Sequence, residues 1–219
     1  MDVFDAIRSR RSIRKYKDKP IAWDLMVQIL QAGKYAPCAG NYMNWKFIVV
    51  KTDPKRKVIA KACNQEWMEQ APVFVVVVAE PMKAERFYGT RGSRLYTVQG
   101  CAASIQNMML MATNIGLGSC WVGAFNEDDI WRILGLPEET SVQGVVTFGY
   151  ADEQPEMPPK HRIEHVMFFE KWWGRLEQPK THLGYWSLWN MKMVDAGKKA
   201  LGKLKDKAEK KIEEKRKKK

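Results

Sequence analysis

Residues 71–79, APVFVVVVA, form the longest apolar run of the chain and give the clearest indication of its fold. Nine residues are far fewer than the roughly 20 that a helix needs to cross a bilayer. Valine-rich segments favour extended structure. The run therefore predicts a buried strand at 73–79 and not a membrane span.

Apolar periodicity on both sides of this run predicts alternating helices and strands. The expected helices are 1–9, 23–35, 53–63, 95–115 and 126–137, and the expected further strands are 46–51, 119–125 and 142–151. Residues 80–94 contain proline, two glycines and mixed charge without clear periodicity, which predicts a mobile loop. No G-x-G-x-x-G motif or Walker-type lysine is present, so a mixed α+β domain is expected rather than a Rossmann fold or a P-loop fold.

The net charge of +12 is concentrated at one end of the chain. Residues 196–219 hold eleven lysines and one arginine against four acidic residues, which accounts for most of the excess. A basic tail of this kind does not predict a specific nucleic-acid partner for the fold. We expect one domain at 1–174 and a C-terminal extension at 175–219, aromatic at first and then a basic amphipathic helix.

The extension has three interpretations. Trp186, Trp189 and the basic helix could lie on an anionic membrane surface, wrap a partner subunit, or bind nucleic acid non-specifically. Wrapping is favoured for 175–195, and a solvated helix is favoured beyond Gly202. Peripheral membrane contact is the less favoured alternative.

Four cysteines, Cys38, Cys63, Cys101 and Cys120, are widely spaced and form no C-x-x-C pair. This spacing favours reduced thiols over a zinc site or a redox dithiol. His161 and His165 have a spacing that two metal ligands could use, but no third ligand accompanies them. Without an export signal near residue 1, the expected location is cytoplasmic.

Two basic clusters are candidates for an anion site. Arg10, Arg11, Ser12 and Arg14 could surround a phosphate, because guanidinium groups bind phosphate through two parallel hydrogen bonds. Lys160 and Arg162 could close on the same anion from an extended segment. Each cluster, taken alone, is also consistent with a solvated surface turn.

Two loops could approach a flat ligand. Small residues at 38–40 precede Asn41, whose side chain supplies an amide. Gly123 and Ala124 lie at the end of the strand and exit loop expected at 119–125 and could expose backbone groups. Both loops could equally be ordinary connections.

Four blocks of the sequence, in this order, resemble the nitroreductase family of FMN-dependent oxidoreductases. They are RSRRSIRKY (8–16), APCAGNYMNWKFIVV (36–50), GLGSCWVGAFNEDDIWRILGLP (116–137) and FGYADEQPEMPPKHRIEHV (148–166). The resemblance extends from residue 1 to about residue 170. It implies an α+β fold with a central, mostly antiparallel sheet flanked by helices, in an intertwined homodimer with FMN at the subunit interface.

The resemblance also implies roles for individual residues. The FMN phosphate would be held by Arg10, Arg11, Ser12, Lys160 and Arg162, and Arg14 would lie near the N1 and O2 edge of the flavin. Pro37, Cys38, Ala39 and Asn41 would come from the partner subunit, and Gly123 and Ala124 would face the N5 side. No side chain is nominated as a covalent catalyst.

The implied activity is hydride transfer from NADH or NADPH through FMN to a nitroaromatic, quinone or related small electrophile. Alternatives are reductive dehalogenation, flavin fragmentation or dehydrogenation on the same fold, or a non-enzymatic flavin-binding or surface-binding role. Phe87, Tyr88, Arg91 and Arg94 could form a substrate lid or a plain solvated loop. The family often has Ser-Ser and Gln-Pro where this chain has Cys38-Ala39 and Met43-Asn44, so flavin affinity and redox tuning are expected to differ.

Overall fold

The computed structural model describes residues 1–174 of the 219-residue chain. A first compact unit spans Met1–Met157, and a second begins at Pro158. The predicted division between 174 and 175 stays a prediction, and the interpretations of the C-terminal extension concern residues outside the described part. None of the described helices is long and apolar enough to span a membrane.

The first unit is built around a four-stranded sheet in which every neighbouring pair is antiparallel. The strands are β1 (Trp45–Val50), β2 (Val73–Ala79), β3 (Gly118–Val122) and β4 (Ser141–Gly149), and their order across the sheet is β1-β2-β4-β3. All seven residues of β2 are buried. The buried strand predicted at 73–79 and the antiparallel α+β class are therefore confirmed.

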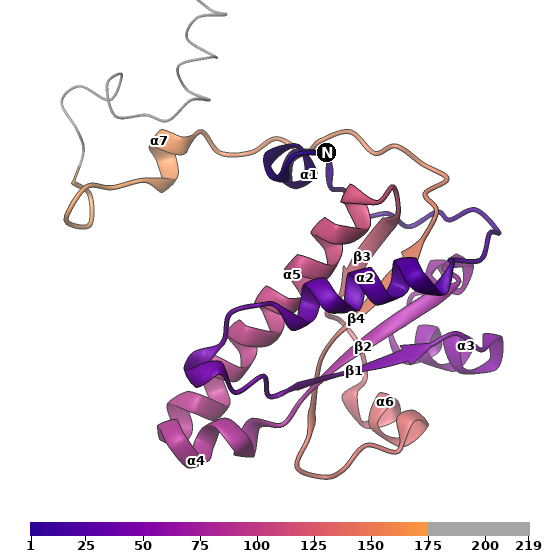
Figure 1. Cartoon of the computed structure of the whole chain (residues 1–219), viewed down its shortest axis with the longest axis horizontal. Coiled ribbons are helices and arrows are strands. Elements are labelled where there is room, and N and C mark those ends of the chain that lie inside the picture. The colour runs from indigo at the N-terminus through magenta and orange to yellow at the C-terminus, as the bar shows by residue number, and fades with distance from the viewer. Residues whose placement is uncertain (175–219) are drawn as a thin grey trace, which may run out of the picture. The chain divides into compact units, whose positions relative to one another are not determined.

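Helices cover both faces of this sheet (Figure 1). On one face, α2 (Trp23–Lys34) and α5 (Thr97–Asn114) pack on Val73, Val75 and Val77. On the other face, α3 (Asp53–Ala62), the short helix η2 (Glu66–Gln70) and α6 (Glu127–Leu134) pack on the alternate residues of β2, which are Phe74, Val76 and Val78. Because successive side chains of a strand point to opposite faces, an all-apolar strand serves both cores.

The helices begin and end close to where local chemistry predicts. Asn126 caps α6 by accepting a hydrogen bond from the Asp129 amide at 3.1 Å. Pro54 lies in the first turn of α3, where a missing N–H costs no helical hydrogen bond. The first unit also contains the short helices α1 (Val3–Ser9) and η1 (Ala39–Asn41), and α7 (Ile163–Val166) lies in the second unit.

The prediction of a mobile loop at 80–94 is wrong. The structure has a helix, α4 (Pro81–Arg91), followed by one π-helical turn, η3 (Gly92–Tyr96), which leads directly into α5. Pro81 starts the helix rather than breaking it, since the first turn needs no N–H partner. Gly89, at φ 56°, interrupts the helical backbone near its end and obscures the periodicity.

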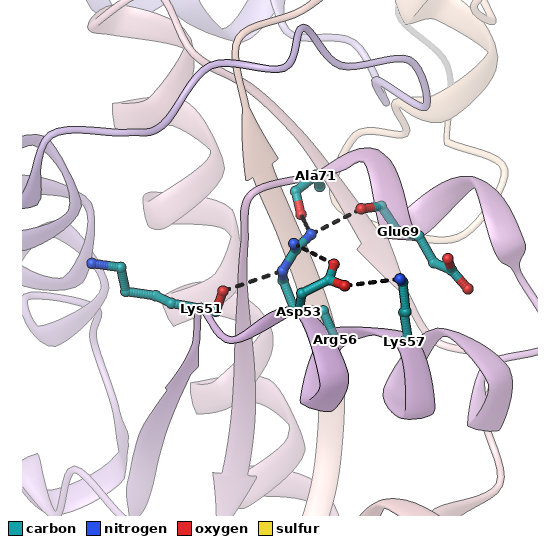
Figure 2. A network of polar contacts seen from close by, with 6 residues as sticks. All are labelled: Lys51, Asp53, Arg56, Lys57, Glu69 and Ala71. Carbon is teal, nitrogen blue, oxygen red and sulfur yellow. Dashed lines mark hydrogen bonds and ion pairs between the residues drawn. The ribbon is translucent and has the colours of Figure 1, made fainter.

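One arginine joins the start of α3 to the end of η2 (Figure 2). The Arg56 guanidinium donates to the carbonyl oxygens of Ala71 at 2.6 Å, Glu69 at 2.8 Å and Lys51 at 3.3 Å. It also pairs with the Asp53 carboxylate at 2.9 Å. The Arg56 side chain is only 13% exposed, so these contacts fix η2 against the beginning of α3.

Candidate functional site

The basic segment at 10–17 is attached to the edge of the sheet by its backbone. Ser12 forms an isolated parallel β-bridge with Ser119 of β3, and the Ile13 amide donates a hydrogen bond to the Ser119 carbonyl at 3.0 Å. Farther along, the Lys17 amide donates to the Tyr150 carbonyl at 2.9 Å. The backbone of the predicted anion-binding residues is therefore held beside β3 and the end of β4. These residues are Arg10, Arg11, Ser12 and Arg14.

Two glycines allow this segment to approach the sheet. Gly118 and Gly149 lie opposite each other in the β3–β4 pairing. A Cβ atom at Gly118 would lie 2.9 Å from Ile13 Cγ1, and one at Gly149 would lie 2.5 Å from Tyr16 Cδ1. Both distances are shorter than real contacts, so glycine is needed at both positions for the segment to lie where it does.

Tyr16, which belongs to the basic segment, and Cys120 of β3 are buried. The Tyr16 hydroxyl donates to the Ile13 carbonyl at 2.7 Å and shares a hydrogen bond with Thr147 at the same distance. Burial raises the pKa of Tyr16 above its usual range and also raises the pKa of Cys120, against the opposing effects of Arg14, Ser12 and Arg10. Both groups are therefore neutral near pH 7, and neither adds a negative charge beside the basic segment.

Arg10 and Arg11 line a cavity of about 310 Å³ at the C-terminal end of α5. Arg11 is engaged with the chain itself, since its guanidinium donates to the carbonyl oxygens of Arg8, Arg10 and Pro155. The Arg10 guanidinium has no hydrogen bond or ion pair with any other residue of the described part. Arg10 is thus available to a ligand, while Arg11 braces the backbone around the cavity.

Arg14 is held by residues that the sequence analysis did not single out. The backbone amides of Arg14 and Lys15 both donate to Glu153 Oε1, the second at 3.0 Å. The Arg14 guanidinium lies 5.9 Å from the centre of the Trp67 ring. The only sequence signal for Glu153 was an acidic residue shortly after a strand, which is ordinarily a solvated position.

The loop that contains Pro37, Cys38, Ala39 and Asn41 lies at the other end of α5. Cys38 packs beside Gly100, in the first turn of that helix, and its sulfur accepts from the Met43 amide at 3.2 Å. Thr113, which lines the Arg10 cavity, is thirteen residues further along α5. At 1.5 Å per residue, roughly 20 Å of helix separates the two predicted parts of the site. The fold does not bring them together within one chain.

Two further predicted residues of the first unit, Gly123 and Ala124, do not line the cavity. Gly123 and Ala124 are exposed and follow β3 at the end opposite Gly118. Lys160 and Arg162 belong to the second unit, where Arg162 lies 3.5 Å from the Glu164 carboxylate. Their predicted contact with a phosphate stays a prediction.

The pair of histidines gives no metal site in the described part of the chain. The ring centres of His161 and His165 are 6.3 Å apart. Within residues 1–174, no group of three or more His, Cys, Asp or Glu side chains is arranged to hold a metal ion.

Comparison with known proteins gives a consistent assignment. The family model described as "Nitroreductase family" matches residues 7–67 and 51–150. A relative from Methanothermobacter thermautotrophicus, named putative NADH dehydrogenase/NAD(P)H nitroreductase, is 34% identical over 160 residues, which cover 71% of this chain and 80% of the relative. A Bacillus subtilis protein named FMN reductase [NAD(P)H] is 28% identical over 181 residues, which cover 75% of this chain and 73% of the relative.

A solved structure is similar over most of the fold. Nitroreductase A from Vibrio parahaemolyticus superimposes with a TM-score of 0.72 at 26% identity, covering 81% of this chain and 79% of the other. Fold, family model and relatives agree, and they cover the sheet, the flanking helices and the basic segment described above. The chain is an enzyme of the nitroreductase family of oxidoreductases.

Proposed function

We infer that this enzyme binds FMN and uses it to transfer a hydride from NADH or NADPH to a nitroaromatic, quinone or related electrophilic small molecule. The single observation that carries the proposal is the Arg10 guanidinium, which lines the cavity and has no hydrogen-bond or ion-pair partner among residues 1–174, in a chain of this family. The names of relatives that include NAD(P)H and FMN support the choice of donor and cofactor.

The residues around the cavity fit a phosphate group chemically. Arg10, which lines the cavity, offers two parallel N–H donors to a dianion, and the exposed Ser12 close by in the chain would add a hydroxyl. Glu153 also lines the cavity, and its Oε1 accepts from the Arg14 and Lys15 amides. Arg11 keeps the surrounding carbonyl oxygens directed toward its own guanidinium and therefore away from the anion. In this proposal Lys160 and Arg162 add further positive charge to the same phosphate.

The separation along α5 supports a site built from two chains. One protomer would supply Arg10, Ser12 and Arg14, and its partner would supply Pro37, Cys38, Ala39 and Asn41. Gly123 and Ala124 would face the reactive edge of the flavin. This arrangement requires a homodimer, and the roughly 20 Å between the two parts within one chain argues for it.

Bound FMN supplies the redox chemistry by accepting and donating a hydride at its N5 position. The protein contributes binding and electrostatics. Arg14 would place a cation near the N1 and O2 edge, where negative charge develops on reduction, and Glu153 fixes the Arg14 backbone for that purpose. Cys38 lies where the family often has serine, so its weaker hydrogen-bonding capacity would lower the affinity for the flavin.

The test is titration of the apoprotein with FMN, followed by flavin fluorescence. Loss of a charged hydrogen bond in Arg10→Ala should weaken binding by about 1–3 kcal/mol, which is a loss of roughly 5- to 150-fold in affinity. Lys15→Ala removes the same charge from an exposed position of the same segment and should change affinity much less. Equal effects of the two variants would show that Arg10 does not contact the phosphate, and failure of the wild-type protein to bind FMN would refute the proposed function.

A further inference from the structure

The short helix η2 contacts the basic segment at two points. The Arg14 guanidinium lies 5.9 Å from the centre of the Trp67 ring, within the range of a cation–π interaction. Two residues later, the Tyr16 amide donates to Gln70 Oε1 at 3.4 Å. The segment that carries the proposed flavin cation therefore rests on η2.

The Arg14 side chain has few other restraints. Its guanidinium makes no hydrogen bond or ion pair with another described residue, and the Arg14 side chain is exposed. Glu153 holds the Arg14 backbone amide and leaves the side-chain torsions open. A long exposed arginine loses up to about 2 kcal/mol of rotamer entropy when it is fixed, so an unrestrained Arg14 would sample many positions.

The Trp67 ring, by contrast, is fixed from several directions. Its indole Nε1 donates to Gln65 Oε1 at 2.9 Å, and the next residue, Met68, is fully buried. The Arg56 contacts seen in Figure 2 hold the Glu69 and Ala71 carbonyl oxygens at the end of η2. The ring is thus a rigid, electron-rich surface presented to a mobile cation.

We propose that Trp67 is a positioning residue for Arg14. Its ring selects the orientations of Arg14 that keep the guanidinium beside the bound flavin, and it acts through Arg14 rather than by chemistry of its own. This inference rests on the proposed FMN function. A cation held near the N1 and O2 edge stabilises the reduced, negatively charged flavin, so Trp67 should raise the reduction potential of bound FMN.

The experiment measures the midpoint potential of FMN bound to the full chain in wild type, Trp67→Leu, Arg14→Met and the double variant. Trp67→Leu should lower the potential, in the same direction as Arg14→Met and by at least half as much. In the Arg14→Met background, Trp67→Leu should add little, because both changes remove one interaction. Trp67→Phe retains an aromatic face and should give a smaller shift than Trp67→Leu.

Two results would overturn the inference while leaving the proposed function intact. The first is an unchanged potential in Trp67→Leu that still binds FMN. The second is a shift that is equally large with and without Arg14, which would mean that Trp67 acts on the flavin directly. If Trp67→Leu does not fold, Trp67→Met, which also removes the aromatic face, takes its place: a shift that disappears in the Arg14→Met background supports the inference, and no shift or an undiminished one overturns it. A wild-type chain that binds no FMN would refute the proposed function and this inference together.

Discussion

Replacing Arg56 by methionine tests how η2, the short helix that contacts the basic segment, is held against α3. The change keeps an apolar stem of similar length and removes every Arg56 donor drawn in Figure 2, while the Lys57–Asp53 pair stays. The shortest bond, 2.6 Å to the Ala71 carbonyl, joins a charged donor to a fully buried residue, and a second bond reaches Glu69 at 2.8 Å. Hydrogen bonds to charged groups contribute about 1.5–3 kcal/mol each, and partial solvation of the second suggests a total loss of about 2–4 kcal/mol.

The assay is urea unfolding followed by circular dichroism at one fixed protein concentration, since assembly would make stability depend on concentration. Lys57→Met is the matched control, because Lys57 pairs with the same Asp53 at 2.8 Å but both side chains are more than half exposed. We expect the control to change the unfolding free energy very little. Equal losses in the two variants, or no loss in Arg56→Met, would refute the view that Arg56 holds η2 through the buried carbonyls.

Two further outcomes follow from buried contacts near the proposed site. Gly149→Ala should lower the unfolding free energy by about 1–3 kcal/mol and weaken FMN binding, because the added methyl group meets Tyr16 and Pro72. An unchanged urea midpoint and an unchanged FMN affinity would contradict this prediction. Thiol labelling of the native protein at pH 8, read by peptide mass spectrometry, should modify the partly exposed Cys38 first, because burial raises the pKa of Cys63 and Cys101 to about 12 and keeps both protonated. Earlier labelling of Cys63 or Cys101 would count against the described packing.

Local sequence signals predicted the elements whose structure depends on local chemistry. The all-apolar run at 73–79 is a strand because β-branched residues on both faces meet two cores. Asn126 marks the start of α6 because its side chain caps the helix within three residues. The helix at 81–91 was missed, since Pro81 and Gly89 resemble breakers, while packing of Tyr42 on Phe87 at 4.3 Å supports α4 from a distant loop.

In the candidate site, too, local sequence signals identify some residues and miss those that act through distant contacts. Arg10, Ser12 and Arg14 could be proposed from the sequence because charge and family blocks mark them. Glu153 and Trp67, which hold Arg14, could not, because their roles arise from contacts with residues that are distant in the chain. Long-range contacts of this kind leave no periodicity or spacing that a single sequence would display.

The most direct test of the central claim is an anaerobic reduction measurement on the purified full chain reconstituted with FMN. We predict a yellow protein whose flavin absorbance bleaches on addition of NADH or NADPH and returns when a quinone or nitroaromatic acceptor is added. Arg10→Ala should require more FMN to reach the same absorbance. A protein that binds no FMN, or whose bound FMN stays oxidised with both nucleotides, would contradict the account.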